Sequence, residues 1–135
     1  GRFQVLPGRP TIVLDVAHNP HAARAFADAL GTMGFHPRTT AVLGMLADKD
    51  IDGVVAAVAG RIDGWHVASL PGPRGASAEV LQARLVAAGV AAPSIRTHSD
   101  VAAAWAAALG EATEADRIVV FGSFLTVAAA MAARR

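Results

Sequence analysis

The chemically richest stretch of the sequence is Asp15-Val16-Ala17-His18-Asn19-Pro20, which follows the apolar run at residues 11–14 and precedes a helical pattern. It would place a carboxylate, an imidazole and an amide at the carboxyl end of a buried strand, the edge where open α/β sheets bind ligands. Asp15 could accept hydrogen bonds from a ribose or a guanidinium, or lie near a metal ion. His18 could bind a phosphate, a carboxylate or a base.

Each of these residues also has a purely structural interpretation. Asp15 could accept hydrogen bonds from the backbone of the next loop, and His18 could simply be exposed or packed. Asn19 fits the N-cap of a helix that has Pro20 at its first position. A metal site at His18 and His21 would need further ligands that the spacing does not identify, so we predict none.

Two further strand ends carry polar groups that could bind an anion. Asp48-Lys49-Asp50 follows the run at residues 39–43 and contains the only lysine among twelve basic residues. It could be a solvated turn, or Lys49 could hold a substrate carboxylate or phosphate. Gly122-Ser123 follows the run at residues 117–121 and offers N–H groups and a hydroxyl, as many helix starts do. Because the carboxyl ends of parallel strands share one edge, we expect these loops to converge.

The elements that position these loops alternate along the chain. Apolar runs predict strands at residues 3–6, 11–15, 39–43, 65–70, 94–97 and 117–121. Periodic apolar positions predict helices at residues 21–33, 51–59, 77–88, 101–109 and 124–133. We expect Gly60 to end the second helix, and Val80, Leu81 and Leu85 to form the buried stripe of the third. The predicted fold is α/β, a Rossmann-like three-layer sandwich with a mostly parallel sheet of about six strands and helices on both faces.

Composition narrows the classes of function. The 135 residues suit one domain, residues 1–135, and the absence of cysteine excludes disulfides and thiolate chemistry. A net charge of +1 argues against nucleic acid, and no apolar run approaches the ~20 residues of a membrane span. We expect a cytoplasmic monomer. The chain has no phosphate loop; Pro71-Gly72-Pro73-Arg74-Gly75-Ala76-Ser77 is the nearest stretch and lacks its lysine. We therefore assign no catalytic residue.

The motifs together resemble a known family. Gly1-Arg2-Phe3-Gln4, Asp15-Val16-Ala17-His18-Asn19-Pro20, Gly44-Met45-Leu46-Ala47-Asp48-Lys49-Asp50-Ile51 and Phe121-Gly122-Ser123-Phe124-Leu125 occur in this order. The pattern is similar to the carboxy-terminal domain of folylpolyglutamate synthase/dihydrofolate synthase, one of the ADP-forming amide ligases related to the Mur ligases. The resemblance covers nearly the whole chain.

The resemblance implies a partner domain, substrates and residue roles. The family's phosphate loop and Mg²⁺ sites lie in an amino-terminal ATPase domain, and ATP activates the carboxyl group of dihydropteroate or of a folate as an acyl phosphate that L-glutamate then attacks. By position, Arg2, Asp15 and His18 would contact ATP, and His18, Lys49 and Ser123 would contact glutamate. The resemblance also implies that the isolated chain has no ligase activity.

Two alternatives remain at this point. A Mur-type ligase domain for cell-wall precursors shares the Asp-x-x-His-x-Pro element, although Gly-Arg-Phe-Gln and the Asp-Lys-Asp loop disfavour it. A Rossmann-type module that binds a small molecule without catalysis would also fit the predicted fold. The sequence does not distinguish dihydrofolate synthesis from polyglutamate extension.

Overall fold

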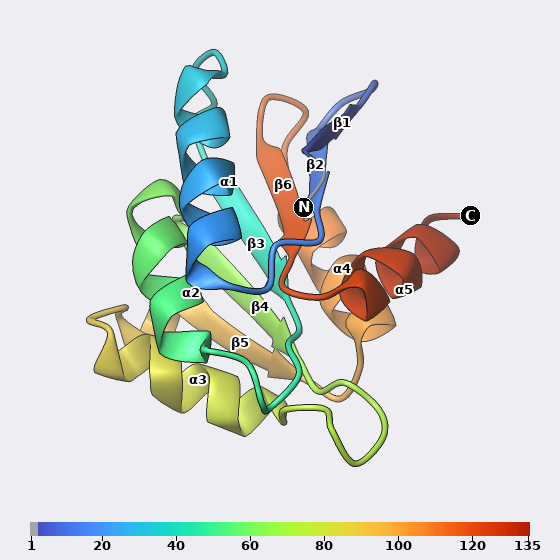
Figure 1. Ribbon diagram of the computed structural model, residues 1–135. Helices are drawn as coiled ribbons and strands as arrows, with labels where there is room; N and C mark the ends of the chain where they lie inside the picture. The colour runs from blue at the N-terminus through green and yellow to red at the C-terminus, as the bar shows by residue number, and fades with distance from the viewer. Residues whose placement is uncertain (1–2) are drawn as a thin grey trace.

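The computed structural model describes residues 3–135, in which one six-stranded sheet has the order β1-β2-β6-β3-β4-β5 (Figure 1). Its strands are β1 (Gln4–Leu6), β2 (Thr11–Asp15), β3 (Thr39–Leu43), β4 (Gly64–Ala68), β5 (Ile95–His98) and β6 (Arg117–Phe121). Only β1 is antiparallel to its neighbour, and all other pairs are parallel. The mostly parallel sheet confirms the predicted Rossmann-like α/β fold.

Helices cover both faces of this sheet, as Figure 1 shows. The helices are α1 (Pro20–Thr32), α2 (Ile51–Val58), α3 (Ala78–Ala87), α4 (Val101–Glu111) and α5 (Phe124–Arg134), with short 3-10 helices at Ala59–Arg61 and Ala92–Ser94. Helices α1, α2 and α3 contribute to one hydrophobic cluster, and α4 and α5 contribute to the other. The sheet therefore separates two cores, which completes the three layers.

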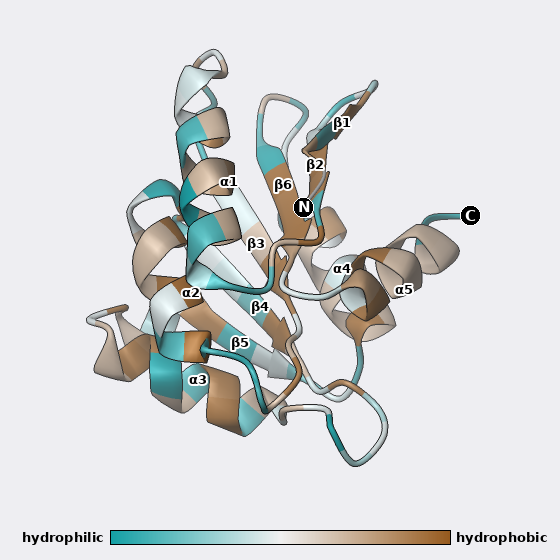
Figure 2. Ribbon diagram, in the orientation of Figure 1, coloured by the Kyte–Doolittle hydropathy of each residue, from teal (hydrophilic) through white to brown (hydrophobic). Residues whose placement is uncertain are grey.

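Alternation along each strand explains why both faces need cover. In β2, Val13 belongs to the cluster under α1, whereas Ile12 and Leu14 belong to the cluster under α4 and α5. Figure 2 shows that β2 and β6 are hydrophobic over most of their length, as strands buried on both faces must be. Each fully buried Val, Leu or Ile contributes about 1.5–3 kcal/mol to folding, so these strands stabilise the sheet from both sides.

Polar caps begin the helices at the carboxyl edge of the sheet. The side chain of Asn19 accepts a hydrogen bond from Ala22 N–H at 2.8 Å, and Asp50 accepts one from Gly53 N–H at 2.9 Å. Ser77, Asp100 and Ser123 cap α3, α4 and α5 in the same way. Each cap contributes about 1 kcal/mol and sets the residue at which its helix begins.

Some predicted details differ in the structure. Gly60 does not end the second helix, because the chain continues as a 3-10 turn over Ala59–Arg61. Val80 is 42% exposed, whereas Leu81 and Leu85 are buried as predicted. Strand β4 starts and ends earlier than residues 65–70. Among residues 3–135, no helix combines the length and the hydropathy needed to cross a membrane.

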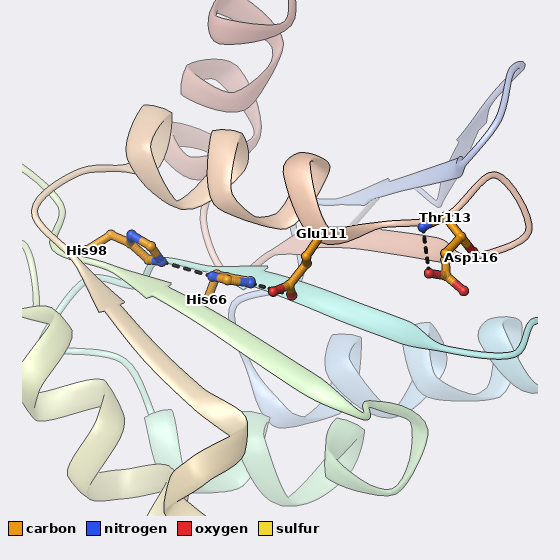
Figure 3. A network of polar contacts seen from close by, with 5 residues as sticks. All are labelled: His66, His98, Glu111, Thr113 and Asp116. Carbon is orange, nitrogen blue, oxygen red and sulfur yellow. Dashed lines mark hydrogen bonds and ion pairs between the residues drawn. The ribbon is translucent and has the colours of Figure 1, made fainter.

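A partly buried polar network of His66, His98 and Glu111 lies between the sheet and α4, and we call it the histidine chain (Figure 3). Nδ1 of His66 lies 2.9 Å from Nε2 of His98, and Nε2 of His66 lies 2.7 Å from Oε1 of Glu111. Because a carboxylate can only accept, His66 donates from Nε2 to Glu111. With that proton on Nε2, the neutral imidazole of His66 accepts at Nδ1 from His98. Both ring nitrogens of His66, which is 2% exposed, are therefore paired.

Candidate functional site

The helices that follow neighbouring strands change from one face of the sheet to the other beside β6. After β2 and β3 the chain enters α1 and α2 on one face of the sheet, whereas after β6 it enters α5 on the other face. Because β6 lies between β2 and β3, the three loops that follow these strands start side by side, and their helices then cover opposite faces of the sheet. Such a switch point leaves a crevice outside the carboxyl ends of the strands, where α/β proteins bind ligands.

Two adjoining hollows occupy this crevice. The main hollow, of about 260 Å³, is lined by His18, Leu46, Lys49, Gly122, Ser123, Phe124 and Leu125. The second hollow, of about 460 Å³, is lined by Gln4, Leu14, Asp15, Val16, Phe124 and Val127. The structure thus brings the predicted residues His18, Lys49 and Ser123 together in the main hollow. Asp15 lines the second hollow, which shares Phe124 with the main one. Arg2 lies outside the described residues.

The loop after β2 shapes both hollows. Asp15 is 5% exposed, and its Oδ1 accepts a hydrogen bond from Ala17 N–H at 2.9 Å. Burial raises the pKa of the Asp15 carboxyl above its ordinary value, although the bond from Ala17 opposes this shift. Nδ1 of His18 lies 3.0 Å from the Val16 carbonyl, which can only accept. The neutral imidazole of His18 therefore presents Nε2 as an acceptor.

The loop after β6 approaches the loop after β3 very closely. Gly122 has φ +109°, and a Cβ there would lie 2.5 Å from the carbonyl oxygen of Gly44, so only glycine fits. The Thr126 hydroxyl, which is fully buried, donates to that same carbonyl at 2.8 Å. These contacts fasten the start of α5 to the loop that carries Lys49, and so fix the main hollow.

The hydroxyl of Ser123 caps α5 through its oxygen and keeps its proton available to a ligand. Its Oγ accepts a hydrogen bond from Leu125 N–H at 3.1 Å, which caps α5. Among residues 3–135 no acceptor is found for the proton of the Ser123 hydroxyl, which lines the main hollow. The start of α5 therefore offers a hydroxyl donor and the positive end of a helix to an anion.

Lys49 is flanked by two carboxylates that are both engaged elsewhere. Asp50 caps α2 through Gly53 N–H, and Asp48 accepts from Nη2 of Arg74 at 3.0 Å. Within residues 3–135, no ion pair involves Lys49. Lys49, a half-buried residue that lines the main hollow, is therefore available to a ligand there.

The chemistry of the two hollows differs. The main hollow combines a cation, an imidazole, a hydroxyl and an apolar wall, which suits an anion with a short carbon chain. In the second hollow, the buried Asp15 offers an acceptor oxygen, which suits a hydroxyl or N–H donor. No group of three or more metal-ligating side chains occurs in the described part of the chain.

The sequence did not predict the apolar wall of the main hollow or the ion pair beside Lys49. Leu46, Phe124 and Leu125 line the main hollow, and Phe124 is 71% exposed. A large apolar residue directly after a helix cap, where water would surround it, was the available signal. The ion pair of Arg74 with Asp48 had no signal, because 26 residues separate its members.

Comparisons with known proteins identify the family of this chain. The family model of the Mur ligase glutamate ligase domain matches residues 1–124. The dihydrofolate synthase/folylpolyglutamate synthase of Escherichia coli is 42% identical over 131 residues, which are 97% of this chain and 29% of that protein. The chain therefore spans about three tenths of the length of this relative.

Two solved structures are similar over nearly the whole chain. E. coli FolC in complex with DHPP and ADP has a TM-score of 0.89 and 42% identity, covering 98% of this chain and 30% of that one. A bifunctional folylpolyglutamate synthase/dihydrofolate synthase with Mn, AMPPNP and L-glutamate bound has a TM-score of 0.88 and 48% identity, covering 99% and 31%. With the family model matched over most of its length, this chain belongs to the Mur ligase family as a glutamate ligase domain.

Proposed function

We propose that this chain is the carboxy-terminal domain of an ATP-dependent ligase that joins L-glutamate to dihydropteroate, to folates, or to both. The observation that carries the proposal is the main hollow, where His18, Lys49 and Ser123 converge from three loops. The relatives are about three times longer, so the complete activity needs residues beyond the part that this chain spans. Relatives bind L-glutamate, DHPP and nucleotides, which supports the same substrates here.

Incoming L-glutamate would occupy the main hollow. Its carboxylates need cationic and hydroxyl donors, which Lys49 and the Ser123 hydroxyl supply beside the N-terminus of α5. Its two methylene groups would contact Leu46 and Phe124 of the apolar wall. The Nε2 acceptor of His18, which lines the main hollow, could accept a hydrogen bond from the substrate ammonium or from the nucleotide.

ATP would lie against the second hollow. The Asp15 oxygen that does not bond Ala17 is an acceptor for a ribose hydroxyl, and Arg2 would add a contact to ATP from the amino-terminal end. The described residues contain no phosphate loop and no cluster for Mg²⁺, so phosphates and metal would be held by the rest of the enzyme. The nucleotide would then lie between the two parts.

The proposed reaction has two steps. The substrate carboxylate attacks the γ-phosphorus of ATP, which releases ADP and forms an acyl phosphate. The neutral amine of glutamate then attacks the acyl carbon, loses a proton and expels phosphate, leaving an amide. An acyl phosphate hydrolyses if water reaches it, so a site shared between two domains protects it by closing. The residues of this chain bind and orient glutamate for the second step.

Binding tests this proposal on the chain itself. Titration of the ¹⁵N-labelled protein with L-glutamate should shift the amides of His18, Lys49 and Leu125, and titration with ATP should shift those around Asp15. Lys49→Met should weaken L-glutamate at least about tenfold, because a charge-assisted hydrogen bond is lost. Arg96→Met, which removes an exposed cation on β5, is the matched control and should bind like the wild type. Shifts that cluster away from both hollows would contradict the proposal.

Activity provides the second test. The 135-residue chain alone should release no ADP. A chimera in which it replaces the matching segment of the E. coli relative should release ADP only when both L-glutamate and dihydropteroate or a folate are present. A folded chimera that releases none, while the parent enzyme does, would argue against the assignment.

A further inference from the structure

The loop at residues 71–76, which resembles a phosphate loop only in its glycines, packs along the loop that carries Lys49. Ala47 N–H donates to the Arg74 carbonyl at 2.8 Å, and Ala76 N–H donates to the Met45 carbonyl at 2.9 Å. Leu46 and Gly75 form an antiparallel bridge between them. Figure 1 shows the two loops beyond the ends of β3 and β4. The backbone around Lys49 is therefore supported from a segment that lines neither hollow.

Gly75 makes this close packing possible. A Cβ at Gly75 would collide with the backbone carbonyl of Leu70, so a larger residue would push residues 71–76 outward. The Leu70 N–H also donates a hydrogen bond to the Ala76 carbonyl at 3.3 Å, which closes the loop. The loop thus folds back on itself and packs against Leu46.

The side chain of Arg74 reaches across this contact to the residue before Lys49. Its Nη2 donates to Oδ2 of Asp48 at 3.0 Å. The Arg74 guanidinium holds the pKa of the Asp48 carboxyl below its ordinary value, and the charge of Lys49 adds to the effect. Asp48 therefore lies within electrostatic reach of both cations, and among residues 3–135 its side chain bonds only Arg74.

We propose that Arg74 is a positioning residue for glutamate binding: by engaging Asp48, it keeps that carboxylate from pairing with Lys49 and leaves the ammonium free for the substrate. This inference rests on the proposed function of the main hollow. Asp50, the other neighbour, is already engaged as the cap of α2. Without Arg74, Asp48 competes with the substrate carboxylate for the same cation.

Double substitution separates this role from simple loop support. Arg74→Ala should raise the Kd of L-glutamate about two- to fivefold, the range for an exposed charge pair. Arg74→Lys should bind nearly like the wild type, because an ammonium can also engage Asp48. Arg74→Ala combined with Asp48→Asn should return to the wild-type Kd, since no carboxylate is left to compete. If Arg74 only supported the loop, Asp48→Asn would give no recovery.

The chain offers a closely matched control pair. Arg84 bonds Asp52 at 3.1 Å with both side chains about as exposed as Arg74 and Asp48, and neither residue lines a hollow. Arg84→Ala should therefore leave the Kd unchanged. The effect of Arg74→Ala should also fade in high salt, which screens exposed charges. An unchanged Kd in Arg74→Ala at low salt would overturn the proposal.

A ligand-free measurement keeps this inference separate from the proposed function. NMR signals of the Lys49 ammonium and the Asp48 carboxyl can be followed together through the titration of Asp48. In Arg74→Ala the Lys49 signals should respond as Asp48 gains its proton, whereas in the wild type they should respond much less. Absence of L-glutamate binding by the wild type would refute the proposed function, while equal Lys49 responses in both proteins would refute the role of Arg74.

Discussion

The histidine chain and the main hollow both hold an imidazole and charged groups, but they differ in how those groups are paired. In the histidine chain, His66 bonds both His98 and Glu111 beneath α4 (Figure 3). In the main hollow, Lys49 has no carboxylate partner among residues 3–135, and His18 bonds only a backbone carbonyl. One network is complete within the fold, and the other is completed only by a ligand.

The difference follows from where each group lies in the sheet. His66 stands in the middle of β4, where water cannot reach it, and an unpaired polar group there would cost about 1–3 kcal/mol. The residues of the main hollow follow the strand ends, where water satisfies them until a ligand arrives. Polar residues in the strands should therefore affect stability, and those in the loops should affect binding.

The largest expected effect comes from His66→Ala. The substitution removes a buried ring and leaves Glu111 and His98 without their shared partner, so the free energy of unfolding should fall by about 3 kcal/mol. His18→Ala, which removes an exposed ring, should change it by less than about 0.5 kcal/mol. Urea denaturation of both variants measures this contrast. Equal losses in the two variants would mean that pairing does not distinguish the two regions.

Asp15→Asn should produce a smaller effect of the opposite sign. Burial disfavours the Asp15 carboxylate, and an amide of the same shape still accepts from Ala17 N–H. We expect the free energy of unfolding at neutral pH to rise by about 1 kcal/mol, as is common when a functional group is replaced. ATP binding should weaken at the same time. A variant that is more stable but binds ATP less tightly would show that Asp15 serves ligand binding.

The pH dependence of this gain follows from the sign of the shift. The pKa of Asp15 is raised in the folded protein, so the protonated carboxyl is favoured by folding. This contribution to the free energy of unfolding is fully present below the ordinary pKa of 3.8 and is lost as pH rises through the folded pKa. The difference between Asp15→Asn and the wild type should therefore be largest at neutral pH and shrink in acid. A difference that stays constant over this range would show that burial of the charge is not its cause.

Patterns within single segments predicted the fold and the three site loops. Residues 11–15, 39–43 and 117–121 became strands with the predicted bounds, because each run is rich in β-branched and other apolar residues that suit burial on both faces. The cap at Asn19 was also predicted correctly. Convergence of the loops followed from parallel strands alone, and the position of β6 between β2 and β3 then completed the crevice.

Contacts between distant segments could not be predicted in this way. The histidine chain depends on the register that pairs Ala68 with His98 and on the extension of α4 to Glu111, beyond its predicted end at residue 109. The spacing of Val80 favoured burial, but the cluster under α3 takes only neighbouring residues of that helix, such as Leu81. Such outcomes are set by how elements pack, which periodicity within one element does not encode.

The smallest expected effect concerns the pH response of the histidine chain at His98. Burial lowers the pKa of the His98 ring, His66 and Arg96 act in the same direction, and Asp100 and Glu111 oppose them. As pH falls through the ordinary value of 6.5, the unfolded chain takes up a proton that the folded protein resists. The free energy of unfolding should therefore decrease until the folded pKa is passed.

His98→Gln isolates this contribution, because its amide can still donate to Nδ1 of His66 but takes up no proton. Urea denaturation between about pH 7.5 and pH 5 should show a flatter dependence for His98→Gln than for the wild type. L-glutamate binding at neutral pH should remain unchanged in this variant, since His98 lines neither the main nor the second hollow. Equal slopes in the two proteins would assign the acid response to another group, and weakened binding would show that the two regions are coupled.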